Sequence, residues 1–378
     1  MMNYAQIPSP CFVLDEAKLR RNLQLLKKVQ EEADVEIICA LKGFSMFSVF
    51  PMVRQYLAGA TASSLHEARL IHEEWGTKAH SYVPAIREDE FGALLALSSH
   101  LTFNSWGQFE RFGQRAAAAG ISCGIRINPQ YSEVTTDLYN PCIPGSRLGV
   151  VRDVLPDQLP SEIEGLHFHT LCENDSHTLE RTLHAVEQRF SDLLGQVKWL
   201  NMGGGHLITR ADYDPAHLVS VLKTFKAKFP HLHIILEPGS AIGWQTGVLV
   251  STVLDVVDAQ GINVAMLDTS FSNHMPDTLE MPYKPQILGA HQQPVEGKPT
   301  YRLGGMTCLA GDFMGDYSFE EPLNVGDQVI FDDMIHYTMV KTSTFNGVNL
   351  PSIGIWQEDE TFRLVRSYGY ESYRDRLS

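Results

Sequence analysis

The stretch that decides the fold is Glu36-Ile37-Ile38-Cys39-Ala40-Leu41-Lys42-Gly43. It is an apolar run of about the length of one buried strand, and it ends abruptly on a single amine. Other apolar runs end in a similar way: His169 closes one, the glycines at 203–205 follow another, and Glu237 closes a third. A chemically distinctive residue at each strand end is typical of a parallel sheet whose site lies at the carboxyl ends of its strands.

Strand and helix signals alternate through residues 15–240. Candidate strands fall at residues 36–42, 59–63, 79–83, 100–104, 121–128, 165–169, 198–202 and 231–237. Candidate helices fall at residues 16–31, 65–74, 106–119, 176–194 and 215–228. Eight strand–helix repeats over roughly 230 residues are typical of a TIM-type (β/α)₈ barrel. We therefore expect an α/β fold in which residues 15–240 form this barrel.

The character of the sequence changes after residue 240. Apolar runs rich in β-branched residues are broken by Gly, Pro and Asp, with little helical periodicity. These runs cover residues 248–257, 264–267, 328–331 and 362–365. We expect residues 241–378 to form a second, all-β domain, a barrel or sandwich. The N-terminal strand, within residues 1–14, has no place inside the barrel and is expected to pair with this domain.

Composition limits the class of protein. The 378 residues carry a net charge of −15, which argues against a nucleic-acid partner. An acidic surface suits a cationic small substrate, but acidity also serves solubility alone. The six cysteines include no CxxC pair, no secretory signal precedes the first strand, and no apolar run approaches the ~20 residues of a membrane span. We expect a cytoplasmic protein that does not enter a membrane.

Lys42 and the histidine pair each admit more than one interpretation. Lys42 is either a surface lysine just past a strand or a Schiff-base lysine whose amine is desolvated enough to be nucleophilic. His167 and His169 share one face of their strand, and either packs as a core residue, acts in catalysis or binds zinc. Zinc hydrolases on barrels carry such a pair on the first strand, whereas this pair ends the sixth. We therefore expect no metal.

The glycine run and Glu237 also admit a purely structural interpretation beside a cofactor-binding one. Gly203-Gly204-Gly205 is either a tight turn or a loop whose N–H groups can close on a phosphate. Glu237 emerges from a very apolar strand, so its carboxylate needs a cation nearby. That cation is either a partner in a structural ion pair or a protonated pyridine nitrogen. An amine, an imidazole, a phosphate cradle and a carboxylate together suit pyridoxal phosphate.

At these positions the chain resembles the fold III pyridoxal-phosphate decarboxylases, the group that includes ornithine, diaminopimelate and carboxynorspermidine decarboxylases. The resemblance runs nearly end to end. The motifs that carry it are Ala40-Leu41-Lys42, Phe168-His169, Gly203-Gly204-Gly205, Glu237-Pro238-Gly239, Gly304-Gly305-Met306-Thr307-Cys308 with Asp312, and Tyr337-Thr338 followed by Ser343-Thr344-Phe345-Asn346-Gly347.

The resemblance implies a role for each of these residues. Lys42 would hold pyridoxal phosphate, His169 would stack on its ring, and Glu237 would keep the ring nitrogen protonated. Further cofactor contacts are implied for Gly203, Gly204, Gly205, Gly239 and Tyr337. Cys308 of the partner subunit would protonate the product carbon, so the resemblance implies a homodimer with shared active sites. Taken without the family, Cys308 would be a buried structural cysteine.

Two segments are most similar to the carboxynorspermidine (carboxyspermidine) branch of the family. They are Leu41-Lys42-Gly43-Phe44-Ser45 and Leu166-His167-Phe168-His169-Thr170-Leu171-Cys172-Glu173. This branch implies pyridoxal-phosphate-dependent decarboxylation of carboxynorspermidine, carboxyspermidine or both, giving norspermidine or spermidine and CO₂ in polyamine biosynthesis. The two substrates differ by one methylene, which changes binding by only ~1–3 kcal/mol, so the sequence does not separate them.

The substrate side of the site departs from the family pattern. Ser240 stands where relatives often have an arginine that contacts the phosphate, and Leu309 stands where an acidic residue usually follows the cysteine. Asp312 is the nearest carboxylate left after the cysteine, and Glu280, by its spacing from Asp268, falls where relatives carry a substrate-binding acid. The resemblance implies that both bind the distal ammonium groups of the substrate. Each could instead be a simple turn carboxylate.

Three other functions compete with this assignment. Another basic amino-acid decarboxylase of the same fold, for ornithine, lysine, arginine or diaminopimelate, is separated by a substrate assay. A racemase would need a second catalytic base, usually tyrosine, in place of the cysteine motif. A catalytically silent homologue that binds a regulatory partner is disfavoured by the intact Lys42 and Cys308.

Overall fold

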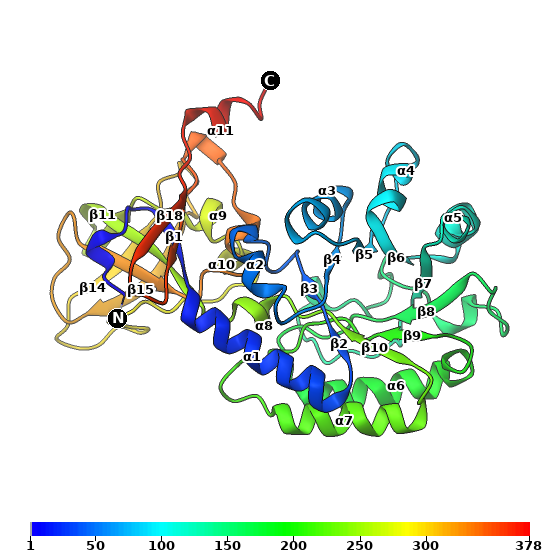
Figure 1. Ribbon diagram of the computed structural model, residues 1–378. Helices are drawn as coiled ribbons and strands as arrows, with labels where there is room; N and C mark the ends of the chain where they lie inside the picture. The colour runs from blue at the N-terminus through cyan, green and yellow to red at the C-terminus, as the bar shows by residue number, and fades with distance from the viewer. Residues whose placement is uncertain (1) are drawn as a thin grey trace. The chain divides into compact units, whose positions relative to one another are not determined.

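The computed structural model describes residues 2–378 and divides into two compact units. One comprises the chain up to Arg21 together with Gly243–Ser378, and the other comprises Asn22–Ile242. Helix α1 (Glu16–Ala33) begins in the former and continues in the latter. Figure 1 shows both units and labels many of their elements.

The unit Asn22–Ile242 is built on a nine-stranded parallel sheet in the order β2-β10-β9-β8-β7-β6-β5-β4-β3. The strands are β2 (Glu36–Ile37), β3 (Cys39–Ala40), β4 (Ala60–Ala62), β5 (Ala79–Tyr82), β6 (Ser98–Phe103), β7 (Ser122–Arg126), β8 (Ile163–His167), β9 (Trp199–Asn201) and β10 (His233–Leu236). β2 and β3 are two parts of one segment: the Ile38 N–H donates to Leu236 O, and the next N–H, of Cys39, donates to Gly59 O. The segment thus pairs with β10 through its first part and with β4 through its second part, so the sheet curls round on itself. The predicted (β/α)₈ barrel is confirmed.

Helices follow most of the strands. They are α2 (Phe50–Val53), preceded by η2 (Phe47–Val49), α3 (Leu65–Leu70), continued by η3 (Ile71–Trp75), α4 (Glu88–Leu97), α5 (Trp106–Ala118), α6 (Ser176–Leu194), α7 (Pro215–Lys228) and α8 (Ser240–Gly243). The starts of α6 and α7 are fixed by side-chain caps, because Asp175 accepts from Thr178 N and Asp214 accepts from His217 N. Their bounds match the predicted ranges at both ends.

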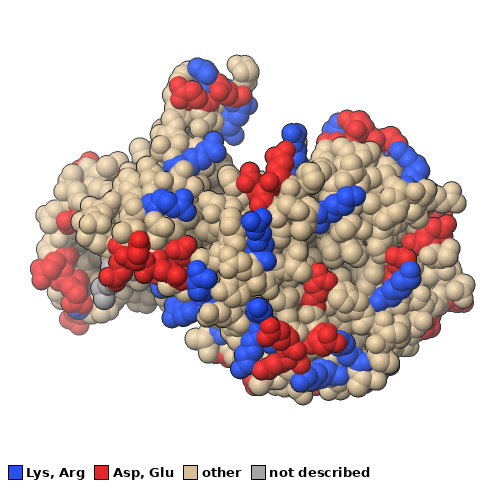
Figure 2. Space-filling model, viewed as in Figure 1, with Lys and Arg blue, Asp and Glu red and all other residues tan. Residues whose placement is uncertain are grey.

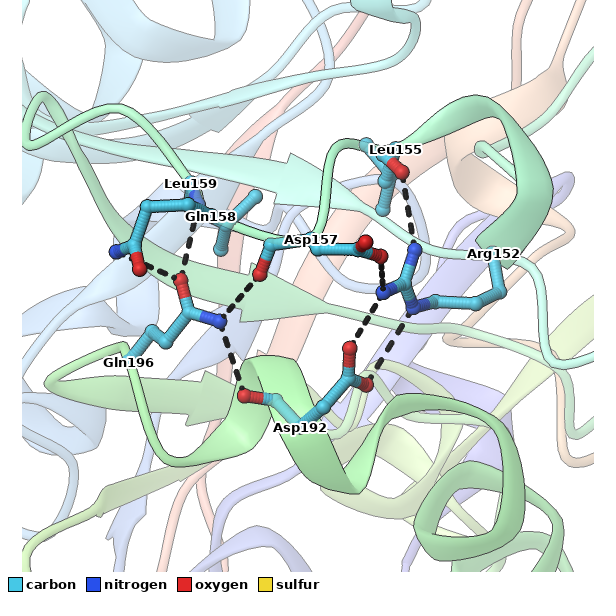
Figure 3. A network of polar contacts seen from close by, with 7 residues as sticks. All are labelled: Arg152, Leu155, Asp157, Gln158, Leu159, Asp192 and Gln196. Atoms are coloured by element: carbon cyan, nitrogen blue, oxygen red, sulfur yellow. Dashed lines mark hydrogen bonds and ion pairs between the residues drawn. The ribbon is translucent and has the colours of Figure 1, made fainter.

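The connection from β7 to β8 contains no long helix. Its described residues, 127–162, hold only the short turns η4 (Asp137–Tyr139) and η5 (Arg152–Val154). Figure 3 shows how polar contacts anchor its second half to the end of α6. The Arg152 guanidinium pairs with the Asp192 carboxylate, and the Gln196 side chain accepts a hydrogen bond from Leu159 N at 2.9 Å. A polar network therefore takes the place of helix packing here.

The other unit is a mixed sheet in the order β13-β15-β14-β12-β11-β1-β17-β18, with β16 paired to β11. Its strands are β1 (Cys11–Asp15), β11 (Gly247–Ala259), β12 (Ile262–Leu267), β13 (Ala290–His291), β14 (Thr300–Gly304), β15 (Phe313–Phe319), β16 (Gln328–Asp332), β17 (Ser352–Trp356) and β18 (Phe362–Arg366). β1 lies antiparallel to β11 and parallel to β17, as expected for the N-terminal strand. Short helices occur as η1 (Tyr4–Gln6), α9 (Phe271–His274), α10 (Asp277–Glu280), η6 (Met339–Lys341), η7 (Phe345–Gly347) and α11 (Tyr370–Arg374).

Two surface properties bear on function. On the face drawn in Figure 2, basic side chains lie among acidic ones. Among residues 2–378, no helix combines the length and the apolar composition needed to cross a bilayer.

Candidate active site

Lys42, His169, the glycine loop and Glu237 lie just beyond the carboxyl ends of β3, β8, β9 and β10, respectively. Because all four strands are parallel, these ends lie at one mouth of the barrel. The structure brings the first two into contact, with Lys42 Nζ 3.1 Å from His169 Nε2. The sequence signal at the strand ends therefore corresponds to one site.

The Lys42 amine is both accessible and crowded. Its side chain is exposed to solvent, yet the surrounding protein lowers its pKa, chiefly by burial and secondly through the positive charge of Arg126. A side chain with both properties lies in a depression rather than on a convex surface. The lowered pKa increases the fraction of neutral amine, which is the nucleophilic form.

The His169 ring is held in one tautomer. Its Nδ1 accepts a hydrogen bond from Gly204 N at 3.0 Å, so the neutral ring carries its proton on Nε2. Burial, followed by the charges of Lys42 and Arg126, holds the pKa of His169 well below its ordinary value. The Nε2–H group therefore donates to the Lys42 amine, and this contact favours the neutral amine, whose lone pair can accept.

Glu237 is an almost buried carboxyl group, with 12% of its side chain exposed. Asn201 Nδ2 donates to its Oε1 at 2.6 Å, and His167 Nε2 lies 3.6 Å from its Oε2. Burial raises the pKa of Glu237, while the Asn201 hydrogen bond and the charge of Lys42 act in the opposite direction. A cation placed beside this group would relieve the cost of burying its charge.

The glycine loop leaves no room for side chains. Gly203 and Gly205 have φ values of +70° and +89°. A Cβ at Gly204 would lie 2.2 Å from Glu237 O, and one at Gly205 would lie 1.9 Å from Leu171 O. The backbone of this loop therefore packs directly on the segments that carry the imidazole and the carboxyl group. Gly239 has slightly more room, since a Cβ there would lie 3.1 Å from Gly43 Cα.

Sequence reasoning missed two residues of this site, Arg126 and Asn201, and gave His167 no role in it. Arg126 Nη2 donates to His169 O at 2.9 Å, and its guanidinium lies 4.8 Å from the centre of the Tyr82 ring. Neither ring nitrogen of buried His167 has a hydrogen bond within the described part of the chain. Arg126, His167 and Asn201 are the last residues of β7, β8 and β9, so the strand-end signal could have found them.

Cys308, Asp312, Glu280 and Tyr337 belong to the other unit, whereas Lys42 belongs to the barrel unit. Cys308 is exposed and lies in the loop between β14 and β15. Exposed apolar side chains occur in the same loop and the segments beside it: Met306, Leu309, Phe313 and Phe345. Cys308 therefore lies among apolar side chains that the single chain leaves uncovered.

The two expected substrate acids have partners within the chain. Asp312 is 4% exposed, and its carboxylate accepts hydrogen bonds from Ser270 Oγ at 2.9 Å and Thr307 Oγ1 at 2.6 Å. Glu280 forms an ion pair with Lys341. Their substrate-binding roles stay predictions. Tyr337 is half-buried and lies edge-on to the His336 ring, with centroids 6.4 Å apart.

One group of potential metal ligands lies outside these residues. His177 and Glu180 of α6 and His217 of α7 have ligand atoms within 4.8 Å of one another. The two rings stack at 3.9 Å, and both histidines belong to the first turn of their helix. The positive ends of two helix dipoles oppose a cation at that place, so we assign no metal to the group.

The barrel and its site define the class expected from the sequence, a fold III enzyme of the pyridoxal-phosphate type. The family model described as pyridoxal-dependent decarboxylase, C-terminal sheet domain, matches residues 11–335. The chain belongs to this family, and it is a decarboxylase.

Individual relatives are similar over nearly their whole length. The chain is 52% identical over 373 residues to a carboxyaminopropylagmatine decarboxylase from Synechocystis, covering 99% of this chain and 96% of that protein. It is 40% identical to a carboxynorspermidine/carboxyspermidine decarboxylase from Campylobacter jejuni, covering 98% and 99%. Among solved structures, carboxynorspermidine decarboxylase from Campylobacter jejuni, complexed with norspermidine, has a TM-score of 0.91 at 39% identity and covers 98% of this chain and 100% of that chain.

Proposed function

We propose that this protein decarboxylates a carboxylated polyamine, carboxynorspermidine or carboxyspermidine, with pyridoxal phosphate bound at Lys42. The observation that carries the proposal is the pairing of the Lys42 amine with a His169 ring whose tautomer is fixed by the glycine loop. Relatives named for these substrates, at 35% and 40% identity, support the choice of substrate.

The residues at the mouth of the barrel fit the cofactor. Lys42 would attach it, the N–H groups of Gly203, Gly204 and Gly205 would hold its phosphate, and the Glu237 carboxylate would pair with its ring nitrogen. A buried carboxyl group with a raised pKa suits this partner, because a protonated ring nitrogen restores the charged form. Gly239 and, from the β unit, Tyr337 are the further contacts that we propose, and Ser240 offers a hydroxyl where relatives have arginine.

When bound, the cofactor supplies an electron sink for the carbon–carbon bond that releases CO₂. Lys42 Nζ would hold the cofactor through its neutral amine. His169 Nε2–H donates a hydrogen bond to Nζ across 3.1 Å and so orients the amine in its neutral form. As CO₂ leaves, the Cys308 thiol would give its proton to Cα, where the electron pair of the broken carbon–carbon bond becomes the new C–H bond, and the thiolate would regain a proton from solvent.

A homodimer with shared sites is part of this proposal. Cys308 belongs to a different unit from Lys42 and is exposed among Met306, Leu309, Phe313 and Phe345. Apolar side chains around a reactive thiol support an interface with a second copy of the chain. A cytoplasmic location is also proposed, and the six unpaired cysteines support it.

A second substrate is favoured by a specific observation, the 52% identity to a carboxyaminopropylagmatine decarboxylase. The agmatine portion of such a substrate ends in a guanidinium group, whereas the carboxylated triamines end in an ammonium group. A planar guanidinium calls for a bidentate carboxylate, whereas an ammonium accepts a point contact. Glu280 and Asp312 were the carboxylates expected at this end of the substrate. Asp312 already accepts hydrogen bonds from Ser270, Ser272 and Thr307, so Glu280 is the carboxylate that we propose here.

The test is CO₂ release by the purified, cofactor-loaded protein, with carboxynorspermidine, carboxyspermidine, carboxyaminopropylagmatine, ornithine, lysine and diaminopimelate offered separately. We expect turnover of the carboxylated polyamines and at least about a hundredfold lower kcat/KM for the three amino acids. The amino acids are shorter and carry no cation as far from the reacting carbon as the terminal ammonium of a polyamine. Preference for carboxyaminopropylagmatine would select the second candidate. Preference for an amino acid would overturn the substrate assignment while leaving the cofactor chemistry.

A further inference from the structure

The loop that carries Cys308 is closed around a buried carboxylate. It joins β14 to β15, and its ends meet where Gly305 N donates to Asp312 O at 2.7 Å. A Cβ at Gly305 would lie 2.5 Å from Asp312 Oδ2, so the loop can close this tightly only with glycine at that position. The Asp312 side chain therefore fills the interior of the loop instead of facing solvent.

Four donors converge on the Asp312 carboxylate. Oδ2 accepts from Thr307 N at 3.0 Å, from Thr307 Oγ1 at 2.6 Å and from Ser270 Oγ at 2.9 Å. Oδ1 accepts from Ser272 N at 3.1 Å. Thr307 immediately precedes the cysteine, whereas Ser270 and Ser272 lie at the start of α9. One carboxylate thus fastens the residue next to Cys308 to a separate part of the unit.

Asn346 holds the loop from the other side. Its Oδ1 accepts from Cys308 N at 2.8 Å, and its own φ is +58°, a left-handed conformation that asparagine tolerates. The neighbouring Phe345 O accepts from Asn273 Nδ2 at 2.9 Å. Asn273 is in α9, so the same short helix supports both the Asp312 contacts and the Asn346 contact.

We propose that Asp312 and Asn346 are positioning residues for the Cys308 thiol. This inference rests on the proposed function, in which Cys308 delivers a proton to the substrate carbon. Proton transfer requires a donor held within a fraction of an ångström, and an exposed loop reaches that precision only if its backbone is tied down. The bonds to Thr307 N and Cys308 N tie down two successive residues. Asp312 acts through the loop and does not contact the substrate.

The experiment compares two substitutions at one position. Asn346→Gly keeps the left-handed backbone and removes the acceptor, whereas Asn346→Asp keeps both. We measure kcat and KM of the cofactor-loaded proteins with carboxynorspermidine and carboxyaminopropylagmatine, and hydrogen exchange of the peptide that spans residues 305–312. We expect Asn346→Gly to lower kcat by about tenfold or more at nearly constant KM and to speed exchange, while Asn346→Asp stays within about threefold of the parent. Asp312→Asn should act like Asn346→Gly.

The outcomes separate this inference from the proposed function. If Cys308→Ser abolishes turnover but Asn346→Gly and Asp312→Asn leave kcat unchanged, the positioning roles are wrong and the proton-donor role stands. A large rise of KM in Asp312→Asn at constant kcat would overturn positioning in favour of substrate binding. If Cys308→Ser keeps the parent kcat, the proposed role of the thiol fails. If hydrogen exchange of residues 305–312 is unchanged in both Asn346→Gly and Asp312→Asn, the inference is wrong, whichever substrate is used.

Discussion

Gly205→Ala tests whether the glycine loop packs as tightly as the structure indicates. Gly205 has φ of +89°, and an added Cβ would lie 1.9 Å from Leu171 O and 2.4 Å from Leu171 C. Gly76 is the matched control, because its φ is +83° but nothing lies within 4 Å of an added Cβ. The two substitutions place alanine at nearly the same positive φ and differ in the contact that the added Cβ makes.

The expected magnitudes follow from this difference. At Gly76, left-handed strain costs about 1–2 kcal/mol, and the lower entropy of the unfolded alanine chain offsets about 0.4–1 kcal/mol. At Gly205 the same balance applies, and overpacking adds about 1–3 kcal/mol. The hydrogen bond from Asn174 N to Gly205 O, which is 3.0 Å long, would also weaken, at a cost of about 1 kcal/mol. Gly205→Ala should therefore destabilise the protein by about 2–4 kcal/mol more than Gly76→Ala.

The assay is urea unfolding followed by circular dichroism, with titration of pyridoxal phosphate followed by absorbance. We expect Gly205→Ala to lower the urea midpoint clearly more than Gly76→Ala and to weaken cofactor binding, whereas Gly76→Ala should bind the cofactor like the parent. Equal midpoints for the two variants would refute the close approach of Gly205 to Leu171.

Three further predictions concern pH, the carboxyl group and the substrate acid. Burial lowers the pKa of both His206 and His274 from 6.5 to about 4, so each is neutral when folded but takes up a proton below pH 6.5 when unfolded. The free energy of unfolding should therefore fall as pH drops from 6.5 toward 4, and at pH 5 each histidine should lower it by about 2 kcal/mol. Urea titrations at pH 7.5 and 5 measure this change. An unfolding free energy that does not change with pH would contradict the burial of the two histidines. Asn201→Ala removes the 2.6 Å donor to Glu237 and the 2.9 Å acceptor of Gly203 N. It should reduce kcat by about tenfold to a hundredfold and destabilise the protein by about 1–3 kcal/mol, whereas unaltered kcat would show that the contact is dispensable. Glu280→Gln should raise KM for carboxynorspermidine by about tenfold, while loss of the exposed Lys341 contact costs at most about 1 kcal/mol of stability; an unchanged KM would remove Glu280 from the substrate site.

Much of the fold follows from local signals. The ranges of α6 and α7 were predictable because an aspartate cap precedes each and apolar residues recur at helical spacing. The pairing of the N-terminal strand with the β unit followed from its position ahead of a closed barrel. The interruption at Ile38 was not predictable, because it arises where the segment exchanges one neighbouring strand for another, and that depends on how the sheet closes.

The residues of the candidate site also divide into those that the sequence predicts and those that only the structure reveals. Lys42, His169 and Glu237 stand out because each is polar at the end of an apolar run. Arg126 and Asn201 also end strands, but they act by donating to the His169 carbonyl and to the Glu237 carboxylate, respectively, and a position at a strand end does not by itself predict such a role. The donors of Asp312 lie up to 42 residues away in the chain, so its burial becomes visible only in the folded unit.

The most direct test of the central claim is to locate the cofactor on the chain. The cofactor-loaded protein is reduced with borohydride, digested and analysed by mass spectrometry, with Lys42→Arg as the control. We predict one phosphopyridoxyl group on the peptide that contains Lys42 and none in the control. A label on a different lysine, or no label on a protein that still releases CO₂, would contradict the account.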